Sequence, residues 1–175
     1  MTETKTYENF PSWIPLLAIT DTLCIYLLGA IILSGFGILT TILYVIYCGA
    51  LEIIVLRRSC INCYYYGKLC GLGKGKICSY FFKKGDPQRF TSRKISWLDL
   101  LPDFLTFIIP LIGGVLLLYL RFFWLILGAM VLILILSIGG NLVIRGFFAC
   151  KYCKQRELGC PAEQLFNKKT KKNST

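Results

Sequence analysis

The sequence predicts an all-α integral membrane protein: a four-transmembrane-helix bundle from two tandem repeated helical hairpins, each followed by a cytoplasmic Cys-x2-Cys-x6-Cys module. Three observations predict this fold: four long apolar runs, basic residues gathered outside the hairpin turns, and one cysteine spacing that occurs twice. Hydrophobic residues make up 55% of the 175-residue chain, more than soluble proteins ordinarily contain.

Four apolar runs are each long enough, or nearly so, to cross a hydrocarbon core of about 30 Å as a helix. They are Ile14–Leu33, Ile38–Leu56, Phe104–Leu120 and Phe122–Ile144. A soluble domain of this size cannot bury four helices that are apolar on every face. Ser34–Gly37 predicts the first reversal. A second is required near Arg121, because one helix through the last two runs would measure about 63 Å. Asp103 is expected at the entrance of the third helix, as an N-terminal charge.

The charge distribution predicts the orientation of the chain. Of the 20 Lys and Arg residues, ten lie between Arg57 and Lys94 and eight between Arg145 and Lys172, whereas the two hairpin turns hold only Arg121. By the positive-inside rule, both termini and the central loop are expected in the cytoplasm. The net charge of +11 arises where this topology requires it, so we expect the lipid bilayer and other membrane or cytoplasmic subunits as partners, and no nucleic acid.

An internal repeat is the second prediction. Ser-Trp pairs occur at Ser12 and Ser96, each opening a hairpin, and a shift of ninety residues superimposes the cysteines of one module on those of the other. The same shift superimposes Gly49 on Gly139, which predicts equivalent tight helix crossings. The chain divides into a first repeat (1–80), a basic interfacial linker (81–95), a second repeat (96–166) and a basic disordered tail (167–175). An even number of spans in each copy predicts parallel hairpins related by an axis along the membrane normal.

Two cysteine modules are the candidate site. The stretches "CINCYYYGKLC" and "CKYCKQRELGC" supply Cys60, Cys63, Cys70, Cys150, Cys153 and Cys160, with Cys78 as a further candidate ligand. Cytoplasmic cysteine clusters bind metal more often than they form disulfides, and thiolates suit Zn²⁺ or iron–sulfur clusters. The chain contains no His, so the site would be sulfur-rich, and no nucleophile–base constellation indicates an enzyme. The adjacent Lys and Arg residues are expected to lower the pKa values of these thiols.

The two halves resemble, in their cysteine spacing alone, the fungal binuclear-zinc-cluster transcription factors. The resemblance implies two tetrahedral Zn²⁺ ions held by six thiolates, with Cys60 and Cys150 bridging and the other four cysteines terminal. The chain departs from that family because 79 residues and a membrane hairpin separate the halves. DNA binding is therefore not carried over.

Three other arrangements of the cysteines stay open. Two Cys-x2-Cys pairs would hold one Zn²⁺ and leave Cys70 and Cys160 unused. The Gly159–Pro161 stretch is similar to the Cys-Pro ligands of ferredoxins, which favours an iron–sulfur cluster. Four spans with Cys-x2-Cys are also similar in outline to membrane thiol oxidases, although those act on the opposite, oxidising face of the membrane.

Polar residues outside the modules provide weaker candidates. Lys74 and Lys76 lie in the glycine-rich stretch "CGLGKGKIC", which is typical of an anion or lipid-headgroup nest. Asp21, Glu52 and Asn141 lie within the apolar runs, where a carboxylate is costly and therefore a functional candidate. A site shared by Asp21 and Glu52 would indicate a small ion or lipid transporter. The leading hypothesis is a membrane zinc-binding scaffold or accessory subunit, with electron transfer or thiol redox chemistry and transport as alternatives.

Overall fold

The computed structural model describes residues 6–93, 96–120 and 123–161, and the basic tail lies outside them. Its helices are α1 (Trp13–Ser34), α2 (Ile38–Arg58), η1 (Cys60–Asn62), α3 (Lys74–Phe81), α4 (Pro87–Thr91), α5 (Trp97–Leu120), α6 (Trp124–Leu134), the π-helical segments η2 (Ile135–Gly140) and η3 (Leu142–Ala149), and α7 (Lys154–Glu157). Within these ranges the chain is all-helical apart from one parallel bridge between Tyr7 and Cys153.

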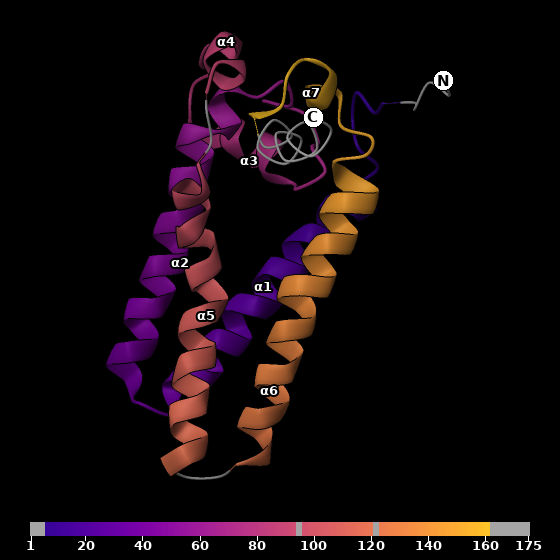
Figure 1. Ribbon diagram of the computed structural model, residues 1–175. Helices are drawn as coiled ribbons and strands as arrows, with labels where there is room; N and C mark the ends of the chain where they lie inside the picture. The colour runs from indigo at the N-terminus through magenta and orange to yellow at the C-terminus, as the bar shows by residue number, and fades with distance from the viewer. Residues whose placement is uncertain (1–5, 94–95, 121–122, 162–175) are drawn as a thin grey trace, which may run out of the picture.

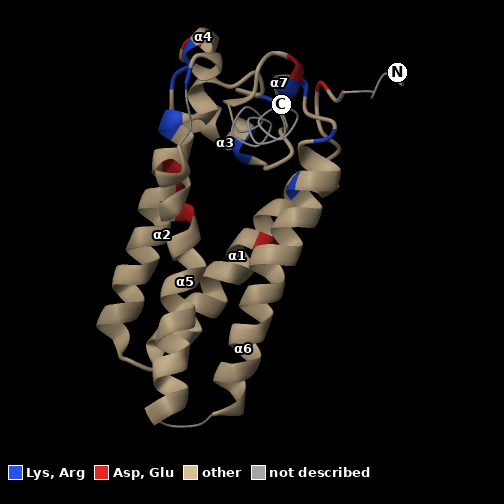
Figure 2. Ribbon diagram, in the orientation of Figure 1, with Lys and Arg blue, Asp and Glu red and all other residues tan. Residues whose placement is uncertain are grey.

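Four helices are long and apolar enough to cross a membrane, which confirms the prediction of a multi-pass membrane protein. They are Trp13–Ser34, Ile38–Asn62, Trp97–Leu120 and Trp124–Ala149. In Figure 1, α1 and α5 run in the same direction, and the two hairpin turns lie at one end of the bundle. The short helices α3, α4 and α7 lie at the other end. We call this end the cap (residues 6–12, 59–93 and 150–161). Most Lys and Arg residues in Figure 2 gather in the cap.

Both predicted reversals are confirmed, but the third helix begins earlier than its apolar run. Gly37 adopts a φ of 117° after α1, a conformation that glycine reaches without strain, and α5 ends at Leu120 before α6 begins at Trp124. The prediction for Asp103 is wrong: α5 begins at Trp97, so Asp103 lies inside the helix. Asp99 occupies the first turn instead, and its carboxylate accepts a hydrogen bond from the Ser96 N–H at 2.9 Å.

A proline in the middle of α5 determines how three helices meet. Pro110 has no N–H, so the carbonyl of Thr106, four residues earlier, loses its helical donor. In lipid that carbonyl has no water to replace the donor. The hydroxyl of Tyr44 on α2 donates to Thr106 O at 2.7 Å, and Tyr44 is only 4% exposed. The Thr106 carbonyl, which lacks a donor within α5, therefore holds α2 against α5.

The tight glycine crossing lies at Gly29 of α1. A Cβ added there would clash with the Tyr44 hydroxyl and would lie 2.8 Å from Pro110 Cγ. The prediction that Gly49 and Gly139 occupy equivalent tight crossings is wrong, because an added Cβ meets nothing within 4 Å at either position. Both of these glycines lie on open helix surface, and the proline on α5 decides where α1 must approach closely.

Replacing Tyr44 by Phe should lower the free energy of unfolding by about 1 kcal/mol or more. Hydrogen bonds between membrane helices average only about 0.6 kcal/mol, but here the mutation leaves an acceptor with no alternative donor. In a Pro110→Ala background the restored N–H can satisfy Thr106 O, so Tyr44→Phe should cost less there. Reversible unfolding in mixed detergent micelles measures this double-mutant cycle.

Tyr47→Phe is the matched control. Its hydroxyl donates to Pro102 O at 2.8 Å, a carbonyl whose helical donor, the N–H of Thr106, is intact. The cost of losing this hydroxyl should therefore be small and independent of Pro110→Ala. Equal costs of Tyr44→Phe in both backgrounds would contradict the orphan-carbonyl explanation.

Candidate functional site

An aromatic cluster joins the two cysteine modules in the cap. Tyr65 of the first module is 2% exposed, and its ring lies 5.5 Å from that of Phe10, which is equally buried. The Tyr7 ring lies 5.4 Å from Phe10 and 5.3 Å from Tyr152 of the second module. The residues before α1 thus pack between two segments that are ninety positions apart in the sequence.

Hydrogen bonds through Tyr65 and Gln155 tie the same segments together. The Tyr65 hydroxyl donates to Tyr7 O at 2.5 Å and accepts from the Lys154 N–H at 2.9 Å. The side-chain oxygen of Gln155, which is 5% exposed, accepts from the Tyr64 N–H at 2.8 Å. Each module therefore satisfies backbone or side-chain polar groups of the other, which fixes their relative position.

Several of the candidate cysteines lie beside this cluster. Cys63, Cys70 and Cys153 all pack against the buried core of Phe10, Ile14 and Tyr65. The Cys63 thiol lies 3.7 Å from Gln155 Oε1, so it contacts the second module directly. Cys70 Sγ accepts a hydrogen bond from the Gly75 N–H at 3.2 Å in the first turn of α3. An N–H aimed at sulfur is a suitable neighbour for a metal-bound thiolate, because it compensates the negative charge.

Burial disfavours the thiolate form of two of these cysteines, Cys63 and Cys153. Burial, reinforced by the nearby Cys70 and Cys160 thiols, raises the pKa of Cys63 to about 11. Burial, reinforced by Cys63 and Cys150, raises the pKa of Cys153 to about 12. The expectation that neighbouring basic residues lower these pKa values is therefore wrong for both thiols. The aromatic surroundings disfavour a thiolate more than exposed lysines and arginines favour it.

The remaining candidate cysteines have different surroundings. Cys60 lies close enough to Cys63, Cys70 and Cys78 to interact with them electrostatically. Cys78 is fully buried, and its thiol donates to Leu56 O at 3.7 Å, while burial and the Cys70 thiol raise its pKa. Cys150 is exposed. Across residues 6–93, 96–120 and 123–161, no three Cys, Asp or Glu side chains converge closely enough to hold a metal ion as they stand.

The two lysines of the glycine-rich stretch, Lys74 and Lys76, have different surroundings. Gly73 adopts a φ of 74° and α3 begins at Lys74, whose ammonium pairs with the Glu52 carboxylate at 2.6 Å. Glu52 also accepts from the Tyr26 hydroxyl at 2.9 Å. Lys76 is exposed on α3. Lys74 therefore serves an intramembrane carboxylate rather than an anion nest shared with Lys76.

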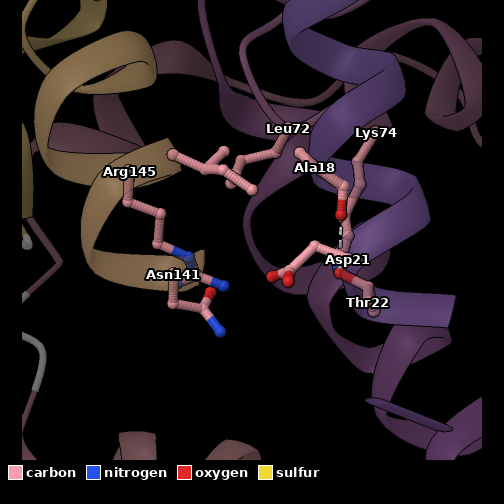
Figure 3. A pocket seen from close by; sticks show the side chains of 8 residues that line it. Ala18, Asp21, Thr22, Leu72, Lys74, Asn141 and Arg145 are labelled. Carbon is pink, nitrogen blue, oxygen red and sulfur yellow. Dashed lines mark hydrogen bonds between the residues drawn. The ribbon is translucent and has the colours of Figure 1, made fainter. Parts of the chain in front are cut away.

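Asp21 and Asn141 line a small polar cavity below the cap. Figure 3 shows Asp21 and Thr22 on α1 facing Asn141 and Arg145 on the last span, with Lys74 beside them. The space open to the centre of a water molecule is about 20 Å³, and Glu52 does not line it. Asp21 and Glu52 thus have separate surroundings, and Lys74 lies between them, lining the cavity and pairing with Glu52.

Sequence analysis missed the residues that join the modules. Tyr65 and Gln155 lie inside the two cysteine motifs, but nothing in the spacing indicates that they contact each other. The run of three tyrosines after Cys63 is the one signal of an aromatic core. Tyr7 and Phe10 precede the first apolar run, and no pattern in the sequence marks them as core residues.

No protein-family model, no curated protein and no solved structure matches this chain. The fold defines its class without them: it is a multi-pass membrane protein with four apolar helices and a polar, cysteine-rich cap at one end.

Replacing Tyr65 by Phe should loosen the contact between the modules, because it removes two hydrogen bonds and keeps the ring. Amide hydrogen exchange should accelerate at Lys154 by roughly fivefold, since about 1 kcal/mol is lost locally. Tyr66→Phe is the matched control: its hydroxyl donates to Phe82 O at the end of α3, so it does not join the two modules. Acceleration at Lys154 in the Tyr66 variant as well would show that the cap opens as a whole.

Proposed function

We propose that the protein is an integral membrane zinc-binding scaffold or accessory subunit, in which both cysteine modules hold metal and clamp the two hairpins together. One observation carries the proposal: Cys63 and Cys70 of the first module and Cys153 of the second pack against the same buried core, and the Cys63 thiol contacts Gln155 of the second module. A three-cysteine half cannot complete tetrahedral Zn²⁺ coordination, so each half requires ligands from the other. Tyr65 and Gln155 already hold the halves in contact.

Cys63, Cys70 and Cys153 are three of the four terminal ligands that the binuclear zinc-cluster resemblance implies, and Cys160 is the fourth. They lie beside α-helical turns and loops rather than inside long helices, so modest side-chain rotation can bring them together. The bridging roles of Cys60 and Cys150 rest on the resemblance alone. Zn²⁺ would displace the thiol protons, and the free energy of forming Zn–S bonds would draw the cysteine sulfur atoms of the two modules together. Metal binding would thus be coupled to tighter association of the two modules.

Metal analysis of the purified protein should find about two zinc ions per chain for the binuclear arrangement and one for a four-thiolate site. Cys63→Ser and Cys153→Ser should each lower zinc content and accelerate unfolding. Cys24→Ser and Cys48→Ser should leave zinc unchanged, because these thiols lie within the spans. Unchanged zinc after both Cys63→Ser and Cys153→Ser would refute a shared site, and iron with sulfide would move the function to electron transfer.

The same contacts bear on the alternative hypothesis of transport. Glu52 is already engaged by Lys74 and Tyr26, and it lies outside the cavity that Asp21 lines. These contacts favour a structural use of Glu52 over a cation site shared with Asp21.

We also propose that the cap faces the cytoplasm and that the two hairpins arose by duplication. The parallel course of α1 and α5 and the gathering of basic residues in the cap support both ideas. A cysteine introduced by Lys83→Cys, exposed in the cap, should resist an impermeant maleimide on intact cells. Phe36→Cys, exposed in the first hairpin turn, should react. The opposite pattern would reverse the orientation and favour a thiol oxidase.

A further inference from the structure

The short helix α3 lies alongside the last turns of α2. The Lys74 ammonium, at the start of α3, pairs with Glu52 at 2.6 Å, and the Cys78 thiol, one turn later, donates to Leu56 O at 3.7 Å. Glu52 precedes the end of α2 at Arg58 by six residues, about 9 Å along the helix. α3 therefore begins beside the interior of a span and rises towards the end of that span.

The loop before α3 enters the bundle between the ends of two other spans. A Cβ added to Gly73 would lie 2.6 Å from the side chain of Ile19, which lies six residues inside the start of α1. A Cβ added to Gly71 would lie 2.7 Å from Ala149 Cβ, at the end of the last span. Trp13, which opens α1, is 48% exposed, as is typical of a tryptophan at the membrane interface. The loop therefore lies at the level of this interface or deeper.

One face of α3 is not covered by the protein. Ile77, Tyr80 and Phe81 are 40%, 75% and 74% exposed. Their spacing of three and four residues places them on one side of the helix, opposite the buried Gly75 and Cys78. In water these side chains would form an apolar patch on a polar cap. At the membrane interface the same face is stabilising, because aromatic and aliphatic side chains of an amphipathic helix bury themselves there.

Basic side chains follow this apolar face in the direction of the water. The Arg57 guanidinium lies 6.0 Å from the centre of the Phe82 ring, and the exposed Lys83 and Lys84 come directly after Phe82 in the chain. Because α3 rises outwards along α2, these cations lie further from the hydrocarbon than Ile77 does. An apolar face below and cations above is the order of acyl chains and phosphate groups in a phospholipid leaflet.

We propose that α3 is an interfacial anchor, embedded in one leaflet of the bilayer, that binds anionic phospholipid. Its apolar face packs against acyl chains, and Arg57, Lys83 and Lys84 contact the phosphate groups. Residues 71–85 contain four lysines and no Asp or Glu, which favours an anionic lipid over a zwitterionic one and over an uncharged protein surface. The anchor uses none of the cysteines, so it is independent of the proposed metal site.

Photo-crosslinking of the full chain in vesicles tests this anchor. Benzoylphenylalanine in place of Phe81 reacts with nearby C–H bonds on illumination, and mass spectrometry identifies the adducts. In vesicles of equal phosphatidylglycerol and phosphatidylcholine content, the adducts should be lipids, with about fivefold enrichment of phosphatidylglycerol. The matched control places the same group at Gln88, which is exposed on α4 at the end of the cap far from the hairpin turns (Figure 1), and should give few lipid adducts.

Equal yields of lipid adducts at Phe81 and Gln88 would overturn the placement of α3 in the bilayer. A polypeptide as the main adduct at Phe81, in vesicles or in the cell membrane, would overturn lipid as the occupant of this face.

The combined substitution of Lys83→Gln and Lys84→Gln should remove most of the enrichment of phosphatidylglycerol at Phe81 and keep the lipid adducts themselves. The matched control combines Arg89→Gln with Lys151→Gln, which removes two exposed basic charges elsewhere in the cap and should leave the enrichment in place. An equal loss in both double variants would overturn a site on α3 in favour of unspecific attraction to the basic cap. Enrichment that survives without Lys83 and Lys84 would overturn their role in binding the headgroup.

Discussion

The hydrogen bond from Tyr44 to the orphan carbonyl of Thr106 is the interaction around which the bundle is organised. A proline in the middle of α5 creates an acceptor that lipid cannot satisfy, and the nearest donor must come from another helix. Gly29 lets α1 approach the same point, so three helices meet at one depth. Because the helices are fixed there, their cap ends can diverge and leave room for polar residues within the membrane.

Polar and aromatic residues hold the cap together, in contrast to the apolar spans below it. Tyr65 is central because its ring packs in the core while its hydroxyl bonds both to the chain before α1 and to the second cysteine module. Such a core is small, and burial raises the pKa of the Cys63 thiol packed against it. A metal ion bound by those thiols would add a covalent-like link where noncovalent contacts are few.

The polar cavity lies directly between these two regions. Its residues come from α1, from the loop before α3 and its first residue, and from the last span, so both hairpins and the cap contribute to it. The salt bridge between Lys74 and Glu52 extends this connection to α2.

The sequence by itself determined the number of spans, the hairpin turns and the separation of apolar from charged segments, because these follow from local composition and helix length. It also identified the cysteines and the intramembrane carboxylates as unusual. Only the tertiary structure decided which residues meet: Gly29 rather than Gly49 at the tight crossing, and Lys74 rather than a second carboxylate beside Glu52. Contacts between segments ninety residues apart depend on helix rotation and on orphan backbone groups, and neither leaves a periodic signal in the chain.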